Sequence, residues 1–449
     1  MDGIIFNDLS DFQVPARSAG AYRIAGFARN HGLRIKVIDY ITHGLKKPRD
    51  LYDIVKTFVT PDTKFFGFAT TFMAVDARLS YFVRSLHNRF PNVKIIFGGQ
   101  SDGSAEFAEL CDDIGYQIHG YGEDSLLQVL GIKANIKFRD IAPMFHVEDN
   151  IKSCEVLPIE LSRGCRFKCK FCAFPLLGRN PKNNEYLRSY DSIFNEIRHN
   201  YESFGTTRYF ILCDTFNETT EKLMVVKRAI DELGIDIQFS AYIRLDLLYA
   251  HPEQVEILHD MGIRAAFFGI ESFHDPSSKA IGKGLGFTKT ISALAHVKEA
   301  WPDTQTHGNF IIGLPHETHT TANEWCNYLV NGEIPVDSWR MNGLSIRKTP
   351  INASEFEKNA TKYGYLFDDI GWFNDHWTQR SADAFALSKR KAGEGTNGVT
   401  SWQAMGMLNY DLPWGTIRST LGAELNTPRY HALNSAFMDE YYKNLLAMT

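Results

Sequence analysis

Short apolar runs of strand length alternate with helical patterns in the first third of the chain. The runs lie at 3–6, 34–40, 65–70, 93–99 and 116–122. Between the third and fourth runs, apolar residues recur at three- and four-residue spacing, which is typical of one buried helix face. They are Val75, Leu79, Phe82, Val83, Leu86 and Phe90. Because strands that alternate with helices form parallel βαβ units, residues 1–130 are predicted to form a doubly wound, Rossmann-like parallel sheet.

The predicted strands end in segments of small and polar residues, which read NDLSDF, TTFM, GGQSD and GYGED. Ligands of open parallel sheets bind beyond the carboxyl ends of the strands, where these segments lie. Gly98 and Gly99 would allow a ligand to approach the backbone closely. Residues 1–130 contain no G-x-G-x-x-G sequence, so a dinucleotide is not the predicted ligand.

A second alternating series starts at residue 156 and has longer helical patterns. Its strand candidates lie at 156–161, 207–213, 237–243, 264–270, 307–313 and 338–346. Repeats of this kind predict an α/β fold with a partial (βα)6 barrel over 156–350, joined to the first domain by a linker at 131–155. In such barrels the functional groups gather at the carboxyl ends of the strands.

Residues 351–449 show a less regular pattern with many aromatic side chains. Trp372, Phe373, His376 and Trp377 lie close together and precede a helical ending. We expect a mostly helical C-terminal extension that closes the open mouth of the barrel and contacts the substrate. The alternative is a packed cap without ligand contacts.

Composition limits the partners of the chain. It has 449 residues, of which 44% are hydrophobic and 22% charged, and its formal net charge is −5. Such a chain has no overall basic field, so nucleic acid is not a predicted partner. No apolar run approaches the about 18 residues of a membrane span. The first residues lack the basic region of a secretory signal, so we expect a cytoplasmic protein without a membrane association.

Three of the seven cysteines, Cys165, Cys169 and Cys172, fall within the segment RGCRFKCKFCAF. The residues between them are largely polar, and the spacing is too tight for a disulfide framework. A zinc site would need a fourth protein ligand, usually from a second pair, whereas the other cysteines are scattered singly. Three thiolates can instead hold three irons of a 4Fe–4S cluster and leave the fourth iron open to a non-protein ligand.

This C-x3-C-x2-C spacing, with Phe171 before the last cysteine, resembles the signature of the radical S-adenosylmethionine (radical SAM) enzyme family. The resemblance implies a partial barrel and a cluster whose open iron is chelated by the amino and carboxylate groups of S-adenosylmethionine (SAM). It also implies that one electron from the cluster cleaves SAM to methionine and a 5′-deoxyadenosyl radical, while the protein provides position and shielding.

The resemblance further implies SAM contacts at the ends of the later strands. Asp214, after the second strand, stands where the family often has Gly-Gly-Glu, and it would contact the methionyl amino group. Arg244, after the third strand, would reach the methionyl carboxylate. In the sequence GIES after the fourth strand, Glu271 and Ser272 would bind the ribose hydroxyls.

In the sequence GNFIIGLPHET after the fifth strand, Ile311, Ile312 and Gly313 would lie beside the adenine ring. Each of these strand-end residues also has a structural alternative. Asp214 could cap the following helix, Arg244 could form a simple ion pair, and Gly313 could serve a turn.

The pattern over 1–130 resembles the cobalamin-binding domain that precedes the barrel in one branch of this family. Gly98-Gly99 and Gly122-Glu123 match the glycine-rich strand ends of that domain. The D-x-H-x-x-G motif, whose histidine ligates cobalt in other cobalamin proteins, is absent. Two interpretations therefore stay open: a domain that binds cobalamin, and a Rossmann-like domain without a cofactor that shields the barrel.

With cobalamin, the expected reaction is a radical methyl transfer to an unactivated carbon; without it, we expect a rearrangement or another hydrogen abstraction. A methylthiotransferase would need a second cluster in the N-terminal domain, which contains only Cys111. A non-catalytic iron–sulfur redox sensor would not need the strand-end motifs. The expected partners are a small-molecule or peptide substrate and an external electron donor of the flavodoxin or ferredoxin type.

Overall fold

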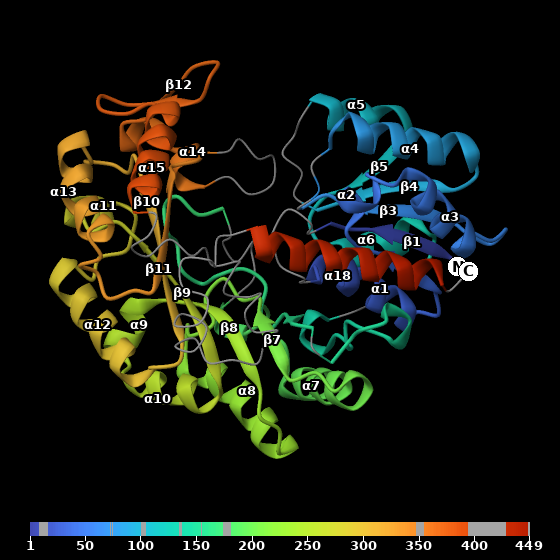
Figure 1. The fold of residues 1–449 in the computed structure, drawn as a ribbon, viewed down its shortest axis with the longest axis horizontal. Coiled ribbons are helices and arrows are strands. Elements are labelled where there is room, and N and C mark those ends of the chain that lie inside the picture. Colours follow the sequence, from blue (N-terminus) through green and yellow to red (C-terminus); the bar gives the residue numbers. More distant parts are fainter. Residues whose placement is uncertain are drawn as a thin grey trace. The chain divides into compact units, whose positions relative to one another are not determined.

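The computed structural model describes residues 1–8, 17–71, 73, 75–99, 105–133, 137–153, 155–173, 181–346, 354–393 and 428–447. The chain folds into two compact units. The first unit comprises Met1–Pro158, Asp191–Thr206 and Pro428–Thr449, and the second comprises Ile159–Tyr190 and Thr207–Thr427. Each unit is built around one large sheet (Figure 1).

The first unit contains the doubly wound sheet predicted for residues 1–130. Its five strands pair in the order β2-β1-β3-β4-β5, and all the pairs are parallel. The strands are β1 (Gly3–Phe6), β2 (Ile35–Ile38), β3 (Phe65–Ala69), β4 (Lys94–Gly98) and β5 (Gly115–Ile118). The helices are α1 (Ala19–Asn30), α2 (Ile41–Gly44), α3 (Pro48–Phe58), α4 (Ala77–Arg89), α5 (Ala105–Ile114), α6 (Gly122–Val129), α7 (Tyr190–Phe204) and α18 (Pro428–Leu446).

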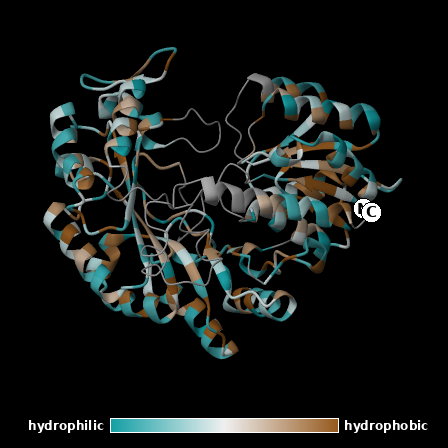
Figure 2. Ribbon diagram, viewed as in Figure 1, coloured by the Kyte–Doolittle hydropathy of each residue, from teal (hydrophilic) through white to brown (hydrophobic). Residues whose placement is uncertain are grey.

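An apolar core cluster of the first unit joins the sheet to α3, α4, α5 and α18. Phe6 of β1 stacks on Phe68 of β3 with ring centroids 4.8 Å apart, and it meets the edge of Phe82 of α4 at 5.5 Å. Helices cover both faces of such a sheet, so its strands are apolar along most of their length, as Figure 2 shows. Fully burying an aromatic side chain of this kind contributes roughly 1.5–3 kcal/mol to stability.

Three arginines in and before α1 form buried ion pairs with acidic residues from distant segments of the first unit. The pairs are Arg17–Glu155 at 2.6 Å, Arg23–Glu196 at 3.2 Å and Arg29–Asp149 at 2.7 Å. These pairs attach the residues before β6, and also α7, to α1. They explain why α7 belongs to the first unit although the sequence pattern placed it within the barrel.

The last helix, α18, packs in the first unit through two tyrosines. The hydroxyl of Tyr441 accepts a hydrogen bond from the backbone N–H of Asp39 (2.9 Å). The hydroxyl of Tyr442 donates to the carbonyls of Asp39 and Tyr40 (2.9 and 2.8 Å). The C-terminal region 351–449 is therefore divided between the two units, and its last helix lies outside the barrel unit.

The second unit contains the six-stranded sheet of the predicted partial barrel, which confirms that part of the fold class. Its strands pair in the order β11-β10-β9-β8-β7-β6, and the pairs from β7 to β11 are parallel. The strands are β6 (Leu157–Ile159), β7 (Arg208–Ile211), β8 (Gln238–Ile243), β9 (Ile263–Glu271), β10 (Gln305–Ile312) and β11 (Ser338–Gly343). The helices between them are α8 (Thr220–Leu233), α9 (Leu245–Ala250), α10 (Glu253–Asp260), α11 (Asp275–Ala280), α12 (Phe287–Ala300) and α13 (His319–Val330).

The sheet of the second unit has a helix-facing side and an inner side. Phe310 of β10 contacts Trp325 of α13 at 5.6 Å between ring centroids, so this side of β10 faces the helices. Side chains of opposite parity form a row of rings on four successive strands, with centroids 5.5 to 6.2 Å apart. The row consists of Phe210, Tyr242, Phe267 and His307. It defines the inner face of the barrel.

Residues 354–393 form a cap on the second unit. Its elements are α14 (Glu355–Lys358), β12 (Leu366–Phe367), β13 (Trp372–Phe373) and α15 (Gln379–Ala392). The buried indoles of Trp372 and Trp377 donate to the carbonyls of Leu344 (2.7 Å) and Glu317 (2.9 Å), whereas His376 is exposed. These contacts favour the packed cap over a substrate-binding segment. None of the helices in the described ranges combines the length and apolar character that crossing a membrane requires.

Candidate functional site

The three clustered cysteines lie in the loop that follows β6. Cys165, Cys169 and Cys172 are half-buried and form no disulfide among the described residues, and the N–H of Cys172 donates to the carbonyl of Cys169 at 3.1 Å. The N–H of Lys170 donates to the carbonyl of Ile281 at 3.0 Å. The loop is thereby attached to the segment that follows β9. It lies beyond the carboxyl end of the first strand, where barrels of this kind place functional groups.

Arg244, directly after β8, brings a positive charge to this loop. Its Nη1 donates to Sγ of Cys169 at 3.5 Å, and its Nε and Nη2 donate to the carboxylate of Asp246 at 3.0 and 2.6 Å. Its guanidinium lies 4.1 Å from the ring centroid of Phe167. Burial acts to lower the pKa of Arg244, but the hydrogen bonds and charge of Asp246 outweigh it and raise the pKa. The structure thus holds a permanent cation beside the cysteine loop.

A buried lysine that the sequence analysis did not single out connects the loops after β6 and β7. Nζ of Lys222 donates to the hydroxyl of Ser162 (2.9 Å), the carbonyl of Thr215 (3.0 Å) and the carboxylate of Glu218 (3.2 Å). The hydroxyl of Thr215 lies 3.5 Å from Sγ of Cys165. The one sequence signal was the i,i+4 spacing of Glu218 and Lys222, which also occurs on ordinary exposed helices.

Asp214 follows β7 and exposes its side chain to solvent. The protein around the carboxyl still removes much of its hydration, and this desolvation raises the pKa of Asp214 to about 6. The charge of Lys222 opposes the shift, and that of Glu218 adds to it. Within the described ranges the carboxylate accepts no hydrogen bond. Thr219, and not Asp214, caps α8, so the helix-cap alternative for Asp214 is excluded.

Glu271 ends β9 in a left-handed backbone conformation (φ 71°) and is buried. Its Oε1 accepts a hydrogen bond from Nζ of Lys283 at 2.7 Å, and the same ammonium donates to the carbonyl of Gly269 at 2.6 Å. The hydroxyl oxygen of Ser272 accepts from the N–H of His274 at 3.0 Å. The turn after β9 therefore holds a paired carboxylate, while Ser272 shapes the turn itself. The ribose contacts of both residues stay a prediction.

Ile312 and Gly313 lie where β10 ends. Ile312 is fully buried and shares its parity with Phe310 on the helix-facing side, whereas Ile311 is half-buried with inner-side parity. The N–H of Gly313 donates to the carboxylate of Glu317 at 2.7 Å. Gly313 has φ 89°, and a Cβ there would lie 2.6 Å from the Trp372 ring, so a turn and a close approach both require glycine. The adenine contact stays a prediction, for which Ile311 is better placed than Ile312.

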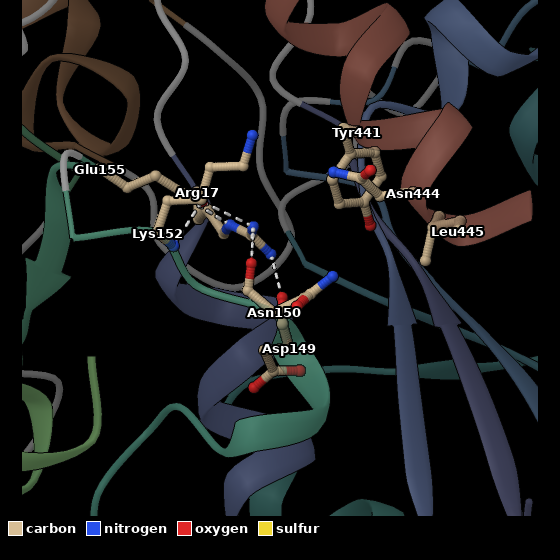
Figure 3. A pocket seen from close by; sticks show the side chains of 8 residues that line it. All are labelled: Arg17, Asp149, Asn150, Lys152, Glu155, Tyr441, Asn444 and Leu445. Carbon is tan, nitrogen blue, oxygen red and sulfur yellow. Dashed lines mark hydrogen bonds and ion pairs between the residues drawn. The ribbon is translucent and has the colours of Figure 1, made fainter. Parts of the chain in front are cut away.

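A pocket in the first unit is lined by Arg17, Asp149, Asn150, Lys152, Glu155, Tyr441, Asn444 and Leu445. Figure 3 shows the guanidinium of Arg17 directed at the carboxylate of Glu155. Arg17 also donates to the carbonyl of Asp149 at 2.8 Å, and Lys152 pairs with Glu440. Because its charged groups already pair with protein partners, we assign this pocket to the packing of the first unit. The candidate site lies in the second unit.

The second unit matches a known sequence family. The Radical SAM superfamily matches residues 159–329, from the last residue of β6 into α13. This part of the chain is a radical SAM domain. The family predicted from the cysteine loop is confirmed.

Curated relatives are more distant. The chain is 26% identical over 329 residues to the uncharacterized methyltransferase PH0819 of Pyrococcus horikoshii, a match that covers 63% of this chain and 67% of that protein. It is 23% identical over 171 residues to the ribosomal protein uS12 methylthiotransferase RimO of Ruegeria pomeroyi, covering 36% of this chain and 37% of that protein. The match thus spans little more than a third of the methylthiotransferase.

Two solved structures are similar over most of the chain. One is the radical SAM methyltransferase TsrM of Kitasatospora setae with tryptophan substrate and a SAM analogue bound, with a TM-score of 0.61 and 14% identity over 81% of this chain and 77% of that chain. The other is the cobalamin-dependent SAM radical enzyme OxsB with aqua-cobalamin bound, with a TM-score of 0.59 and 14% identity over 99% and 72%. At this identity the similarity shows the fold. It confirms the predicted fold class.

Proposed function

We propose that this chain is a cobalamin-dependent radical SAM methyltransferase that methylates an unactivated carbon of a small molecule. The observation that carries the proposal is the C-x3-C-x2-C loop, which follows the first strand of the six-stranded sheet at the start of a radical SAM domain. The similar structure of TsrM, described with cobalamin and a [4Fe-4S] cluster bound, supports the assignment of cofactors.

The cysteine loop suits a 4Fe–4S cluster better than a single metal ion. Among the described residues, no three His, Cys, Asp or Glu side chains converge closely enough to hold one ion. A cluster does not require such convergence, because each thiolate binds a different iron. Cys165, Cys169 and Cys172 would hold three irons. When bound and reduced, such a cluster supplies the electron that cleaves SAM to methionine and a 5′-deoxyadenosyl radical.

The residues around the loop would orient SAM by its methionyl end. Asp214, whose carboxylate accepts no hydrogen bond within the described ranges, would accept from the methionyl amino group. Arg244 is held by Asp246 with Nη1 directed at Cys169, so its cation would lie on the carboxylate side of SAM. Lys222 would act through the two loops that it holds together and not through SAM itself.

The other two strand ends would hold the nucleoside half of SAM. Glu271 and Ser272 are proposed for the ribose, and the end of β10 at Ile311 and Gly313 for the adenine. The left-handed conformations of Glu271 and Gly313 turn the chain sharply at both strand ends. Such turns expose backbone groups that can hydrogen-bond to a nucleoside.

Cobalamin would bind beyond the carboxyl ends of the first sheet. The strand order changes direction between β1 and β3, which is the position where open parallel sheets bind ligands. At the ends of β4 and β5, Gly98 and Gly120 have no described atom within 4 Å of where a Cβ would lie. A side chain would fill the room that these glycines leave for a ligand. The missing D-x-H-x-x-G motif means that no histidine of that motif would ligate the cobalt.

The cluster and SAM can be tested together by electron paramagnetic resonance of the anaerobically reconstituted, reduced chain. We expect SAM to change the spectrum of the cluster, because SAM would bind the open iron. The variant Arg228→Met, on the outer helix α8, serves as the control and should respond like the unchanged chain. If SAM leaves the spectrum of the cluster unchanged, the proposed SAM site is refuted and the redox sensor is favoured.

The cobalamin assignment is tested separately by adding cobalamin, desalting and recording the absorption spectrum. Retention near one cobalamin per chain supports methyl transfer, and the substrate search then looks for methylated carbons. No retention would replace methyl transfer by the second candidate, a cobalamin-independent rearrangement or hydrogen abstraction. The absence of the cobalt-ligating histidine motif is the observation that keeps this second candidate open.

A further inference from the structure

The inner face of the barrel carries an arginine near the middle of β11. Arg340 lies in register with Asn309 of β10, which lies in register with Gly269 of β9. Arg340 has the same parity as Ser338, whose hydroxyl lies 2.7 Å from Nδ1 of His307 in the row of rings. Because parity alternates along a strand, the side chain of Arg340 belongs to the inner face.

Arg340 is half-buried and has no carboxylate partner within the described ranges. Its Nε donates to the side-chain carbonyl of Asn342 at 3.4 Å. Desolvation lowers the pKa of Arg340, and the charge of Arg390 on α15 lowers it further; the hydroxyl of Tyr242 acts in the opposite direction. A partly desolvated cation without a counter-charge among the described residues is unfavourable, and a bound anion would supply that charge.

The acidic residues on neighbouring elements are engaged elsewhere. Glu271 of β9 pairs with Lys283 at 2.7 Å, and Asp337, directly before β11, pairs with Lys298 at 2.5 Å. Asp383 of α15 lies against the backbone of Gly343, whose parity is opposite to that of Arg340. None of these carboxylates neutralises Arg340.

The surroundings of Arg340 suit a flat apolar group. Tyr242 belongs to the row of rings, yet 36% of its surface is exposed. Phe267 supports it from 5.5 Å between ring centroids but is itself buried, so Tyr242 presents the aromatic surface. By register, Tyr242 is level with Phe267, His307 and Ser338, so Arg340 lies one inner-face position nearer the carboxyl ends of the strands. Asp214 follows β7 at that same end of the sheet. The predicted SAM site and this arginine therefore share one space.

We propose that the inner face binds the substrate through an anionic group, a carboxylate or a phosphate, which Arg340 holds while the apolar part of the substrate packs against Tyr242. This inference rests on the proposed function, since it assigns the substrate class of the same site. A planar guanidinium donates two parallel hydrogen bonds to either anion. The carbon to be attacked would thereby be fixed relative to the SAM site.

The test uses three probes of similar shape with the reconstituted chain: phenylacetate, phenyl phosphate and the neutral phenylacetamide. Their affinities are measured by isothermal titration calorimetry for the unchanged chain, Arg340→Met and Arg340→Lys. The matched control is Arg264→Met, which removes a half-buried arginine of helix-facing parity from β9 of the same sheet. We expect at least one anion to bind more tightly than the amide, and Arg340→Met to weaken it by about tenfold or more.

Arg340→Lys keeps the charge but not the planar fork, so it should keep part of the preference for the anion. It also keeps the test decisive if Arg340→Met does not fold. Whether phenylacetate or phenyl phosphate binds more tightly identifies the anion. Three results would each overturn the inference. The anions and the amide bind with equal affinity, neither anion binds, or the Arg340→Met variant still prefers the anion to the amide. The electron paramagnetic resonance spectrum of the same samples is recorded with and without SAM. If SAM still changes the spectrum, the proposed function stands even when the inference about Arg340 is overturned.

Discussion

Both units bury charged side chains, but three buried arginines of the first unit have carboxylate partners, whereas the arginine on the inner face of the second has none within the described ranges. Around α1, three buried arginines each meet a carboxylate within 3.2 Å. On the inner face of the barrel, the half-buried Arg340 has no such partner within the described ranges, and neither has the exposed Asp214 at its carboxyl end.

Elsewhere in the second unit, Lys222 pairs with Glu218, whereas the buried Glu317 accepts hydrogen bonds from Gly313 and Trp325. In the described part of the first unit, Lys36 and Asp39 are likewise buried with hydrogen bonds instead of an ion pair: Lys36 donates to the carbonyl of Glu148, and Asp39 accepts from Asn7 and Tyr22. Arg340 differs from these groups because it lies on the inner face of the barrel.

The presence or absence of an ion-pair partner distinguishes charges that stabilise the fold from charges that are available to bind a ligand. A buried ion pair offsets its own desolvation only when geometry and hydrogen bonds are good, as they are for Arg17 and Glu155. A charge left unpaired in a half-buried position destabilises the free protein, and perturbed groups of this kind gather at functional sites. The comparison therefore points to the inner face of the barrel as the place of reaction.

The largest effect is expected at the cysteine loop. Replacing Cys165, Cys169 or Cys172 with alanine should abolish cluster assembly and all SAM cleavage, because no second ligand set lies in the sequence nearby. Bound iron and 5′-deoxyadenosine formation are the measurements. Cys111→Ala, at a half-buried thiol of α5 in the first unit, is the control and should keep both. Full turnover in any one of the three loop variants would show that its cysteine is not a ligand.

A large loss of stability is expected when a buried pair of the first unit is broken. Arg17→Met leaves the carboxylate of Glu155 buried without its partner and should lower the free energy of unfolding by about 3–5 kcal/mol. The side chains of both residues are only 2% exposed. Urea unfolding followed by circular dichroism measures the change.

The double variant Arg17→Met/Glu155→Gln sharpens this prediction. It removes both charges, so it should recover part of the lost stability relative to the single variant. If Arg17→Met unfolds at the same urea concentration as the unchanged chain, the buried pairs do not hold the first unit together. The contrast between the two units would then lose its basis.

The sequence predicted the two sheets because their signals are local. Apolar runs such as 65–70 and 264–270 become buried strands, and the cysteine spacing is read from eight consecutive residues. The position of α18 could not be predicted in this way. It depends on the hydroxyls of Tyr441 and Tyr442, which bond to residues about four hundred positions earlier in the chain. The spacing of apolar residues along the chain does not predict a contact between such distant segments.

The candidate site was predicted in part. The loop and Arg244 come together as expected, since their strand ends are neighbours in a barrel. Lys222 and Arg340 were missed for different reasons. Lys222 belongs to an ordinary helical pattern, whereas the sequence around Arg340 contains an unusual pattern of polar residues. Strands of a parallel sheet are usually apolar on both faces, whereas Ser338, Arg340 and Asn342 are polar at every second position.

A smaller effect is expected from the buried carboxyl of Glu317. Burial raises the pKa of Glu317 to about 7, although hydrogen bonds from Gly313 and Trp325 act to lower it. The folded state therefore holds the proton more tightly than the unfolded state. Its contribution to stability is complete below pH about 4.5 and is lost as the pH rises through about 7, by at most about 3 kcal/mol.

Urea unfolding at several pH values measures this contribution. Glu317→Gln should remove the decline in stability between pH about 5 and about 7. Glu324→Gln, at an exposed position of α13, is the control and should leave the decline unchanged. An identical decline in both variants would show that another group causes it.

The smallest effect is expected at an exposed pair with the same chemistry as the buried ones. Arg84 and Asp113 lie 2.9 Å apart in the first unit, with 39% and 48% of their side chains exposed. Arg84→Ala should lower the free energy of unfolding by less than about 1 kcal/mol, and salt should reduce the difference further. Urea unfolding at low and high salt measures both. A loss as large as that of Arg17→Met would mean that ion pairs matter here regardless of burial. An unpaired arginine on the inner face of the barrel would then no longer stand out as a binding group.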